Sequence, residues 1–153
     1  MVDPKRIEQA KLAREYRDTN GAKFMRATFD APIMKFLNST ASAAYLRGAN
    51  GGGKSYAVAW LATATALGRY PAGYQGWKPK LRDDAYACTI IVMSQSAQVL
   101  RDAMQMHLLG DVAGGQLGSG MIPKDAIVSV QMSRGIAGAV DFAVIRRDDG
   151  KLT

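Results

Sequence analysis

The stretch Gly48-Ala49-Asn50-Gly51-Gly52-Gly53-Lys54-Ser55 decides the expected fold of this chain. It matches the phosphate-binding pattern G-x-x-x-x-G-K-S/T at every position, which chance alone would produce in about one chain in a hundred of this length. Residues 43–46 favour a short buried strand before the loop, and residues 56–67, rich in Ala, Leu and Val, favour a helix after it. This order of strand, loop and helix is the context that the motif requires.

The residue types in this loop suit a phosphate group. Glycines let the backbone curl so that successive N–H groups point inward, and the N-terminus of the following helix adds positive partial charge. Lys54 is expected to reach the β- and γ-phosphates of a nucleoside triphosphate, and the Ser55 hydroxyl to complete a Mg²⁺ shell. The alternative is a flexible glycine turn with a solvated Lys54. The predicted nucleotide-binding residues are Gly48, Ala49, Asn50, Gly51, Gly52, Gly53, Lys54, Ser55 and Tyr56, with Ser55 as the Mg²⁺ ligand.

Composition sets outer bounds on the class of protein. The chain has 153 residues, 48% of them hydrophobic, which is enough for one core and one domain. The lone Cys88 excludes disulfides and cysteine metal sites, and it favours a reducing compartment. No apolar run reaches the length of a membrane span, and the charged start of the chain does not fit a signal peptide. We therefore expect an intracellular protein without membrane contact.

The net charge of +7 is unevenly distributed along the chain. Residues 1–80 hold 13 Lys and Arg against 5 Asp and Glu, whereas residues 81–153 hold 7 against 8. A positive field in the half that carries the loop would attract a polyanion, either nucleotide alone or nucleotide together with nucleic acid. Ordinary solubilising charge explains the same numbers equally well.

Residues 1–22 are expected to form a helical arm apart from the rest of the chain. Asp3 can act as its N-cap, Pro4 fits the first helical position, and Asn20-Gly21 is a stop signal. Its apolar stripe is narrow, so a peripheral arm is expected, with binding to a partner or to DNA as the alternative. Residues 23–153 form the predicted domain, in which Pro32 can start a short helix.

The segments after the loop helix alternate between loop, strand and helix. Residues 68–79 are dense in Gly, Pro and aromatic residues, which predicts an ordered loop whose rings stack on a base or anchor the loop to the core. Residues 85–93 are near-continuously apolar, as a strand buried in a parallel sheet would be. Ser94 or Ser96 can cap a following helix that runs to about Leu109, where Gly110 ends it. The only histidine, His107, is expected to be a cation near the end of this helix.

The last third of the chain favours antiparallel strands. Five glycines in residues 110–120 predict a mobile loop. Residues 126–132 and 139–146 alternate apolar and polar side chains, which predicts a hairpin turning at residues 133–135. Asp148-Asp149-Gly150 is a turn signal, and residues 151–153 resemble the start of another strand.

Taken in order, these segments resemble the N-terminal ATPase domain of the large terminase subunit, the DNA-packaging motor of tailed bacteriophages. The resemblance covers the chain from about Pro32 to its end. The stretches that carry it are Leu46-Arg47-Gly48-Ala49-Asn50 running into Gly53-Lys54-Ser55, Leu67-Gly68-Arg69-Tyr70-Pro71 with Gly76-Trp77, Leu100-Arg101-Asp102, Leu108-Leu109-Gly110, and Met121-Ile122-Pro123-Lys124-Asp125-Ala126-Ile127-Val128.

The resemblance implies a fold and a set of partners. The fold would be α/β, a P-loop NTPase with three layers around a mostly parallel central sheet, incomplete at the C-terminus of this chain. The cofactors would be ATP and Mg²⁺. The partners would be double-stranded DNA, the small terminase subunit, the procapsid portal and further copies of the chain, in the cytoplasm of the infected cell. Lys54 and Arg47 would be the catalytic residues, in an activity that couples ATP hydrolysis to DNA translocation.

The chain departs from that family at three places. Large terminases usually carry an arginine within the phosphate loop, where this chain has Asn50, Gly51 and Gly52, so that Arg47 is the nearest candidate. An upstream glutamine that contacts adenine is replaced by Met34-Lys35, and the strand-end Asp and Glu that hold Mg²⁺ and activate water have no match. We therefore expect impaired hydrolysis. The alternative functions are a truncated, nucleotide-responsive module that binds DNA or motor subunits without turnover, and an unrelated small phosphoryl-transfer enzyme.

Overall fold

The structure is a computed structural model, and it describes residues 27–49, 51–71, 73–82 and 85–153. The predicted arm over residues 1–22 lies outside the described residues. The elements in chain order are α3 (Ala31–Leu37), α4 (Lys54–Leu67), α5 (Ala97–Val99), a π-helical turn (Leu100–Gln105), α6 (Met106–Leu108), a 3₁₀ turn (Lys124–Ala126), β1 (Ile127–Met132) and β2 (Val140–Ile145).

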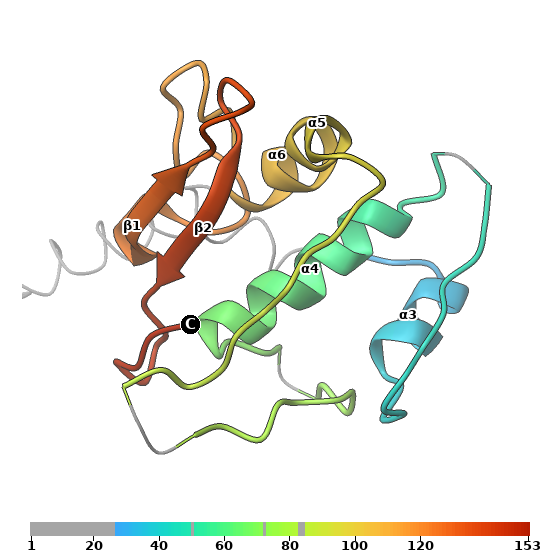
Figure 1. Cartoon of the computed structure of the whole chain (residues 1–153). Helices are drawn as coiled ribbons and strands as arrows, with labels where there is room; N and C mark the ends of the chain where they lie inside the picture. The colour runs from blue at the N-terminus through green and yellow to red at the C-terminus, as the bar shows by residue number, and fades with distance from the viewer. Residues whose placement is uncertain (1–26, 50, 72, 83–84) are drawn as a thin grey trace, which may run out of the picture.

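The central element is α4, which confirms the helix expected after the glycine loop. Figure 1 shows α4 crossing the middle of the molecule, with α3 on one side and α5, α6 and the β1–β2 hairpin on the other. Its side chains are apolar or small on nearly every face, which is typical of a helix buried all round. Gly68, at a φ of 69°, ends it. The buried residues are Ala57, Ala59, Trp60, Thr63, Ala64, Thr65, Ala66 and Leu67.

The short helix predicted at Pro32 is present as α3. Pro32 occupies the first turn, where its missing N–H is not needed. Ile33 and Leu37 are buried and belong to the same core cluster as Trp60 of α4. Helix α3 therefore packs against α4.

The helix predicted between Ser96 and Gly110 is also present, with a π-helical turn in its middle. Ser96 is the N-cap, because its Oγ accepts a hydrogen bond from the Val99 N–H at 3.2 Å. Gly110, at a φ of 87°, follows its last residues. The hydrogen bonds from Met121 N to His107 O (2.8 Å) and from Ile122 N to Leu108 O (2.9 Å) tie the far end of the glycine-rich segment 110–120 to this helix.

The predicted hairpin is confirmed. Strands β1 and β2 pair antiparallel, with Val130 opposite Ala143, and the register shifts twice along β1. The connection is longer than the expected three-residue turn and covers residues 133–139.

The predicted P-loop fold, with a three-layer architecture and a mostly parallel central sheet, is wrong. In the described residues the named strands form one sheet of two antiparallel strands. Residues 43–46 form no strand, and residues 85–93 contribute only an isolated bridge at Tyr86. The physical reason is that a strand needs a hydrogen-bonded neighbour. The apolar run 85–93 has the composition of a buried parallel strand but lacks parallel neighbours along most of its length.

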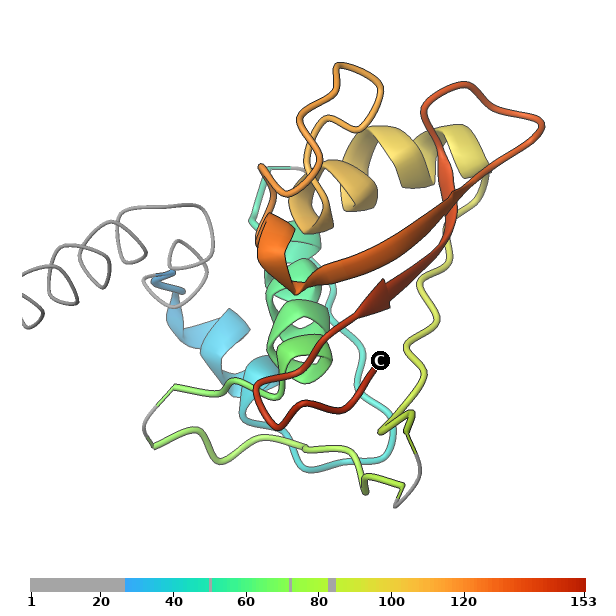
Figure 2. The same ribbon diagram turned by 90° about the vertical axis from the view of Figure 1, so that its left-hand side faces the viewer.

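The end of the described chain forms a short ladder beside β2. Leu152 bridges Arg146 in antiparallel direction and Tyr86 in parallel direction. The hydrogen bonds between Ile145 and Thr153 are 2.8 Å in both directions, and Ala87 N donates to Leu152 O at 2.8 Å. Residues 151–153 therefore lie between residues 145–147, at the end of β2, and residues 85–87 (Figure 2).

The aromatic loop at residues 68–79 anchors itself on the core. The rings of Tyr70 and Tyr74 stack with centroids 4.9 Å apart, and Tyr74 also lies 6.0 Å from the Trp60 ring. Lys78 Nζ sits 5.1 Å from the Tyr70 centroid. Burial raises the pKa of both tyrosines. These contacts favour the anchoring role for Tyr70 and Tyr74 over base stacking.

Candidate nucleotide-binding loop

The glycine loop leads directly into the N-terminus of α4. Its approach, residues 43–49, carries no regular structure and is largely exposed. Gly51 has a φ of 78° and Gly53 a φ of 70°, a backbone region that side-chain-bearing residues rarely adopt. Between them Gly52 N donates to Ala49 O at 3.3 Å, which closes a tight turn. The sequence needs glycine here because the chain must reverse within a few residues before the helix begins.

Helix α3 supports the base of the loop. A Cβ built on Gly53 would lie 3.4 Å from Ile33 Cδ1, which is van der Waals contact. Ile33 is itself buried against α4. The position of the loop therefore depends on the packing of α3, as well as on the glycines.

Lys54 lies over the loop. Its Nζ donates to Gly48 O at 2.8 Å and also to Ala49 O, so the ammonium group is held by two backbone carbonyls. The first turn of α4 contains no acidic residue, so its own side chains leave the positive end of the helix dipole unneutralised. A bound phosphate would accept hydrogen bonds from this ammonium group in place of those carbonyls.

The other predicted site residues fall into three groups. Gly48, Ala49, Gly51, Gly52 and Ser55 are exposed around the turn, whereas Asn50 lies outside the described residues. Tyr56 is half-buried, and its ring contacts Phe29 (6.0 Å) and His107 (5.7 Å).

These positions decide which atoms a ligand can reach. The ring of Tyr56 belongs to the packing, so its backbone is the part that a phosphate can contact. Arg47 is exposed beside Gly48. The structure thus brings the loop, Lys54 and Ser55 together and leaves Arg47 at the rim.

Two aspartates lie at the opposite end of α4 from Ser55. Asp148 pairs with Arg69 through two hydrogen bonds of 2.8 and 2.7 Å, and its N–H donates to Leu67 O at 2.9 Å. Asp149 accepts from Arg147 Nε at 3.2 Å, and the Lys151 N–H lowers the pKa of the Asp149 carboxyl. Because α4 has 14 residues, its two ends are about 20 Å apart. These carboxylates are too far away to share a metal with Ser55.

Two residues that the sequence analysis did not single out, Gln105 and Arg147, form hydrogen bonds between elements that pack around α4. Gln105 is buried and bridges its helix to the hairpin, donating to Gly138 O at 2.7 Å and accepting from Val140 N at 2.8 Å. Arg147 is also buried, and its guanidinium donates to Thr65 O at the C-terminal end of α4. Two sequence signals could have indicated these residues. Gln105 is an amide within an apolar helix face, and Arg147 belongs to the charged pair Arg146-Arg147 directly after an apolar strand.

Comparisons with protein-family models, with curated proteins and with solved structures find no match for this chain. Within the described residues, no group of three or more His, Cys, Asp and Glu side chains is placed to hold a metal ion. None of the described helices has the length and apolar character needed to cross a membrane.

Proposed function

We propose that the chain binds the phosphates of ATP, with Mg²⁺, at the loop from Gly48 to Ser55. The observation that carries the proposal is the placement of this loop. Two glycines with positive φ lead into a 14-residue helix with no acidic residue in its first turn, and Lys54 stands over the turn. Successive backbone donors, a helix N-terminus and a lysine are the elements that hold polyphosphate. The Ser55 hydroxyl would supply one Mg²⁺ ligand.

The proposed biological role is the nucleotide-binding part of a DNA-packaging motor of the large-terminase type. The motif order from residue 46 to residue 128 supports this role, together with the excess of basic residues in the first 80 residues. Such a motor would act on double-stranded DNA in the cytoplasm of the infected cell. The distance of Asp148 and Asp149 from the loop favours a module that binds ATP without hydrolysing it by itself.

The first test is ATP binding by Lys54→Ala. The variant loses a charge-assisted hydrogen bond to phosphate, so we expect its affinity for Mg²⁺–ATP to fall by about 100-fold. Isothermal titration calorimetry measures the affinity directly. Lys80→Ala is the matched control, because it removes an equal charge from an exposed lysine outside the loop. Equal affinities of Lys54→Ala and the unmodified chain would refute the assignment.

The second test concerns DNA. Residues 1–80 carry 13 basic residues against 5 acidic ones, and residues 1–26 contribute 7 of the 13. We expect weak, sequence-independent binding of duplex DNA. Its affinity should fall steeply as the salt concentration rises, because basic side chains that neutralise DNA phosphates release the cations bound there, and added salt opposes this release. Fluorescence anisotropy with two unrelated duplexes at several salt concentrations measures it. Binding that is absent at low salt, or independent of salt, would contradict this expectation.

A further inference from the structure

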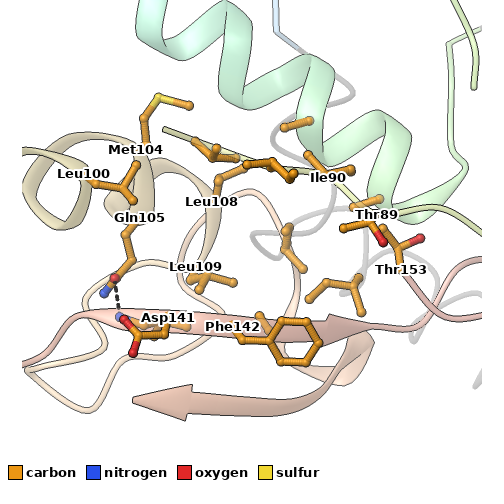
Figure 3. Close-up of a pocket in the computed structure, with 18 of the residues that line it drawn as sticks. Thr89, Ile90, Leu100, Met104, Gln105, Leu108, Leu109, Asp141, Phe142 and Thr153 are labelled. Carbon is orange, nitrogen blue, oxygen red and sulfur yellow. Dashed lines mark hydrogen bonds between the residues drawn. The ribbon is translucent and has the colours of Figure 1, made fainter. Parts of the chain in front are cut away.

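The aromatic loop continues into a basic segment at the molecular surface. Residues 77–82 read Trp77-Lys78-Pro79-Lys80-Leu81-Arg82. Figure 2 shows this part of the chain along the lower edge of the molecule. We call residues 77–80, together with residues 39–42 beside them, the tryptophan patch. Its residues belong neither to the glycine loop nor to the lining of the apolar cavity of about 390 Å³ shown in Figure 3.

Trp77 is fixed through its backbone while its side chain stays accessible. Its N–H donates to Ser39 O at 3.0 Å, and its carbonyl accepts a hydrogen bond from the Tyr74 hydroxyl at 3.2 Å. Tyr74 is itself held against the rings of Tyr70 and Trp60. Trp77 is nevertheless 46% exposed, whereas Trp60 is only 4% exposed. A large ring on a fixed backbone loses little conformational freedom when it binds a partner, which favours a contact there.

The charge around Trp77 is positive. Residues 68–82 contain four basic residues and no acidic one. Lys78 Nζ lies 5.1 Å from the centroid of Tyr70 and 5.9 Å from that of Tyr74, so its ammonium group is held over the tyrosine pair. Within the part of the chain that the structure describes, neither Lys78 nor Lys80 is paired with a carboxylate. Residues 39–42 add hydroxyl groups and no charge.

These groups together match the chemistry of an unpaired nucleotide. Bases stack on accessible aromatic rings, and phosphates accept hydrogen bonds from lysines and hydroxyl groups. In a duplex each base is covered on both faces by its neighbours, so an indole ring reaches a base face more readily in a single strand. An acidic peptide would satisfy the two lysines but would leave the ring of Trp77 uncovered.

We propose that the tryptophan patch binds single-stranded nucleic acid without sequence preference. One base stacks on Trp77, and the flanking phosphates contact Lys78 and Lys80. Every base has a flat face, so the contact does not depend on sequence. The proposal is independent of ATP binding at the glycine loop. It also differs from duplex binding through basic charge alone, because it requires the ring of Trp77.

The experiment uses the full chain and an oligothymidylate of about twelve nucleotides, a length typical of single-strand sites. Because Trp60 is buried, quenching of tryptophan fluorescence reports on Trp77. We expect saturable quenching that is absent in Trp77→Leu. Fluorescence anisotropy of the labelled strand gives the affinity, which we expect to fall at least about fivefold in Trp77→Leu, because stacking on the ring is lost. A strand of the same length without bases keeps the phosphates, and it should bind at least about fivefold more weakly for the same reason.

Tyr45→Leu is the matched control, since it removes a ring that is 88% exposed on another segment. We expect it to bind the strand like the unmodified chain. Lys80→Ala should weaken binding of the strand and leave ATP affinity unchanged. Duplex binding should be equal in Trp77→Leu and the unmodified chain, so a failure here would leave the expectation for duplex DNA standing.

Four outcomes would overturn the proposal. They are unchanged fluorescence at saturating strand, equal binding of the strand without bases, equal binding by Trp77→Leu, and an equal loss in Tyr45→Leu. Circular dichroism checks that Trp77→Leu is folded, and the strand without bases tests the proposal on the unmodified chain. Tighter binding of a duplex of equal length that is lost in Trp77→Leu would make paired DNA the partner and would also overturn it.

Discussion

The purified 153-residue chain is expected to hydrolyse ATP at less than about 10⁻³ s⁻¹, against about 1 s⁻¹ or more for a working enzyme. Phosphoryl transfer requires a metal-holding carboxylate, a residue that positions water and a cation for the transition state. Asp148 and Asp149 are engaged with Arg69 and Arg147 at the far end of α4. The loop itself contains no arginine, and an arginine finger alone contributes about 10³ to 10⁵ in rate.

Steady-state phosphate release, measured with and without duplex DNA, tests this expectation. Lys54→Ala serves as the control for contaminating ATPases, and we expect it to match the unmodified chain. A rate near 1 s⁻¹ that disappears in Lys54→Ala would show that the site is complete. Asp141, the acidic residue of β2, would then be the first carboxylate to replace, as Asp141→Asn.

The second large effect is expected at Gly68, where Gly68→Ala should lower the free energy of unfolding by about 3 kcal/mol or more. Gly68 has a φ of 69°, and a non-glycine residue there costs about 1 to 2 kcal/mol. The added Cβ would also lie 2.5 Å from a guanidinium nitrogen of Arg147. Displacing that buried cation from Thr65 O removes a hydrogen bond of a charged group, which typically contributes about 1.5 to 3 kcal/mol.

Urea denaturation of Gly68→Ala measures the loss, and the chain offers a matched control. Gly150 has a φ of 82° but no atom within 4 Å of its built Cβ. Gly150→Ala should therefore show the backbone cost alone, about 1 to 2 kcal/mol. Similar losses for the two variants would mean that the Arg147 contact contributes little to stability.

The elements that the sequence predicted correctly depend on local chemistry. Residues 56–67 form a helix because their apolar side chains suit a buried one, and Gly68 ends it through its own backbone freedom. Ser96 caps its helix within three residues, and the hairpin follows from alternation over short stretches. Such signals lie within a few residues of the structure they determine.

The predictions that were wrong depended on distant partners. Residues 43–46 and 85–93 have strand composition, but a strand forms only where another strand lies beside it. The predicted parallel sheet was therefore wrong, although the helix after the glycine loop was predicted correctly. Gln105 and Arg147 were missed for a related reason, because their roles arise from Val140 and Thr65, which lie 35 and 82 residues away.

The contacts at the C-terminal end of α4 have a consequence for how long the folded state lasts. Arg69 and Asp148 are 79 residues apart, and Thr65 and Arg147 are 82 apart. Contacts that close such long stretches carry a large entropic cost and form late in folding. Weakening a late contact speeds unfolding more than it slows refolding. We therefore expect the loss of the Arg147 guanidinium to show first as faster unfolding and faster cleavage by proteases.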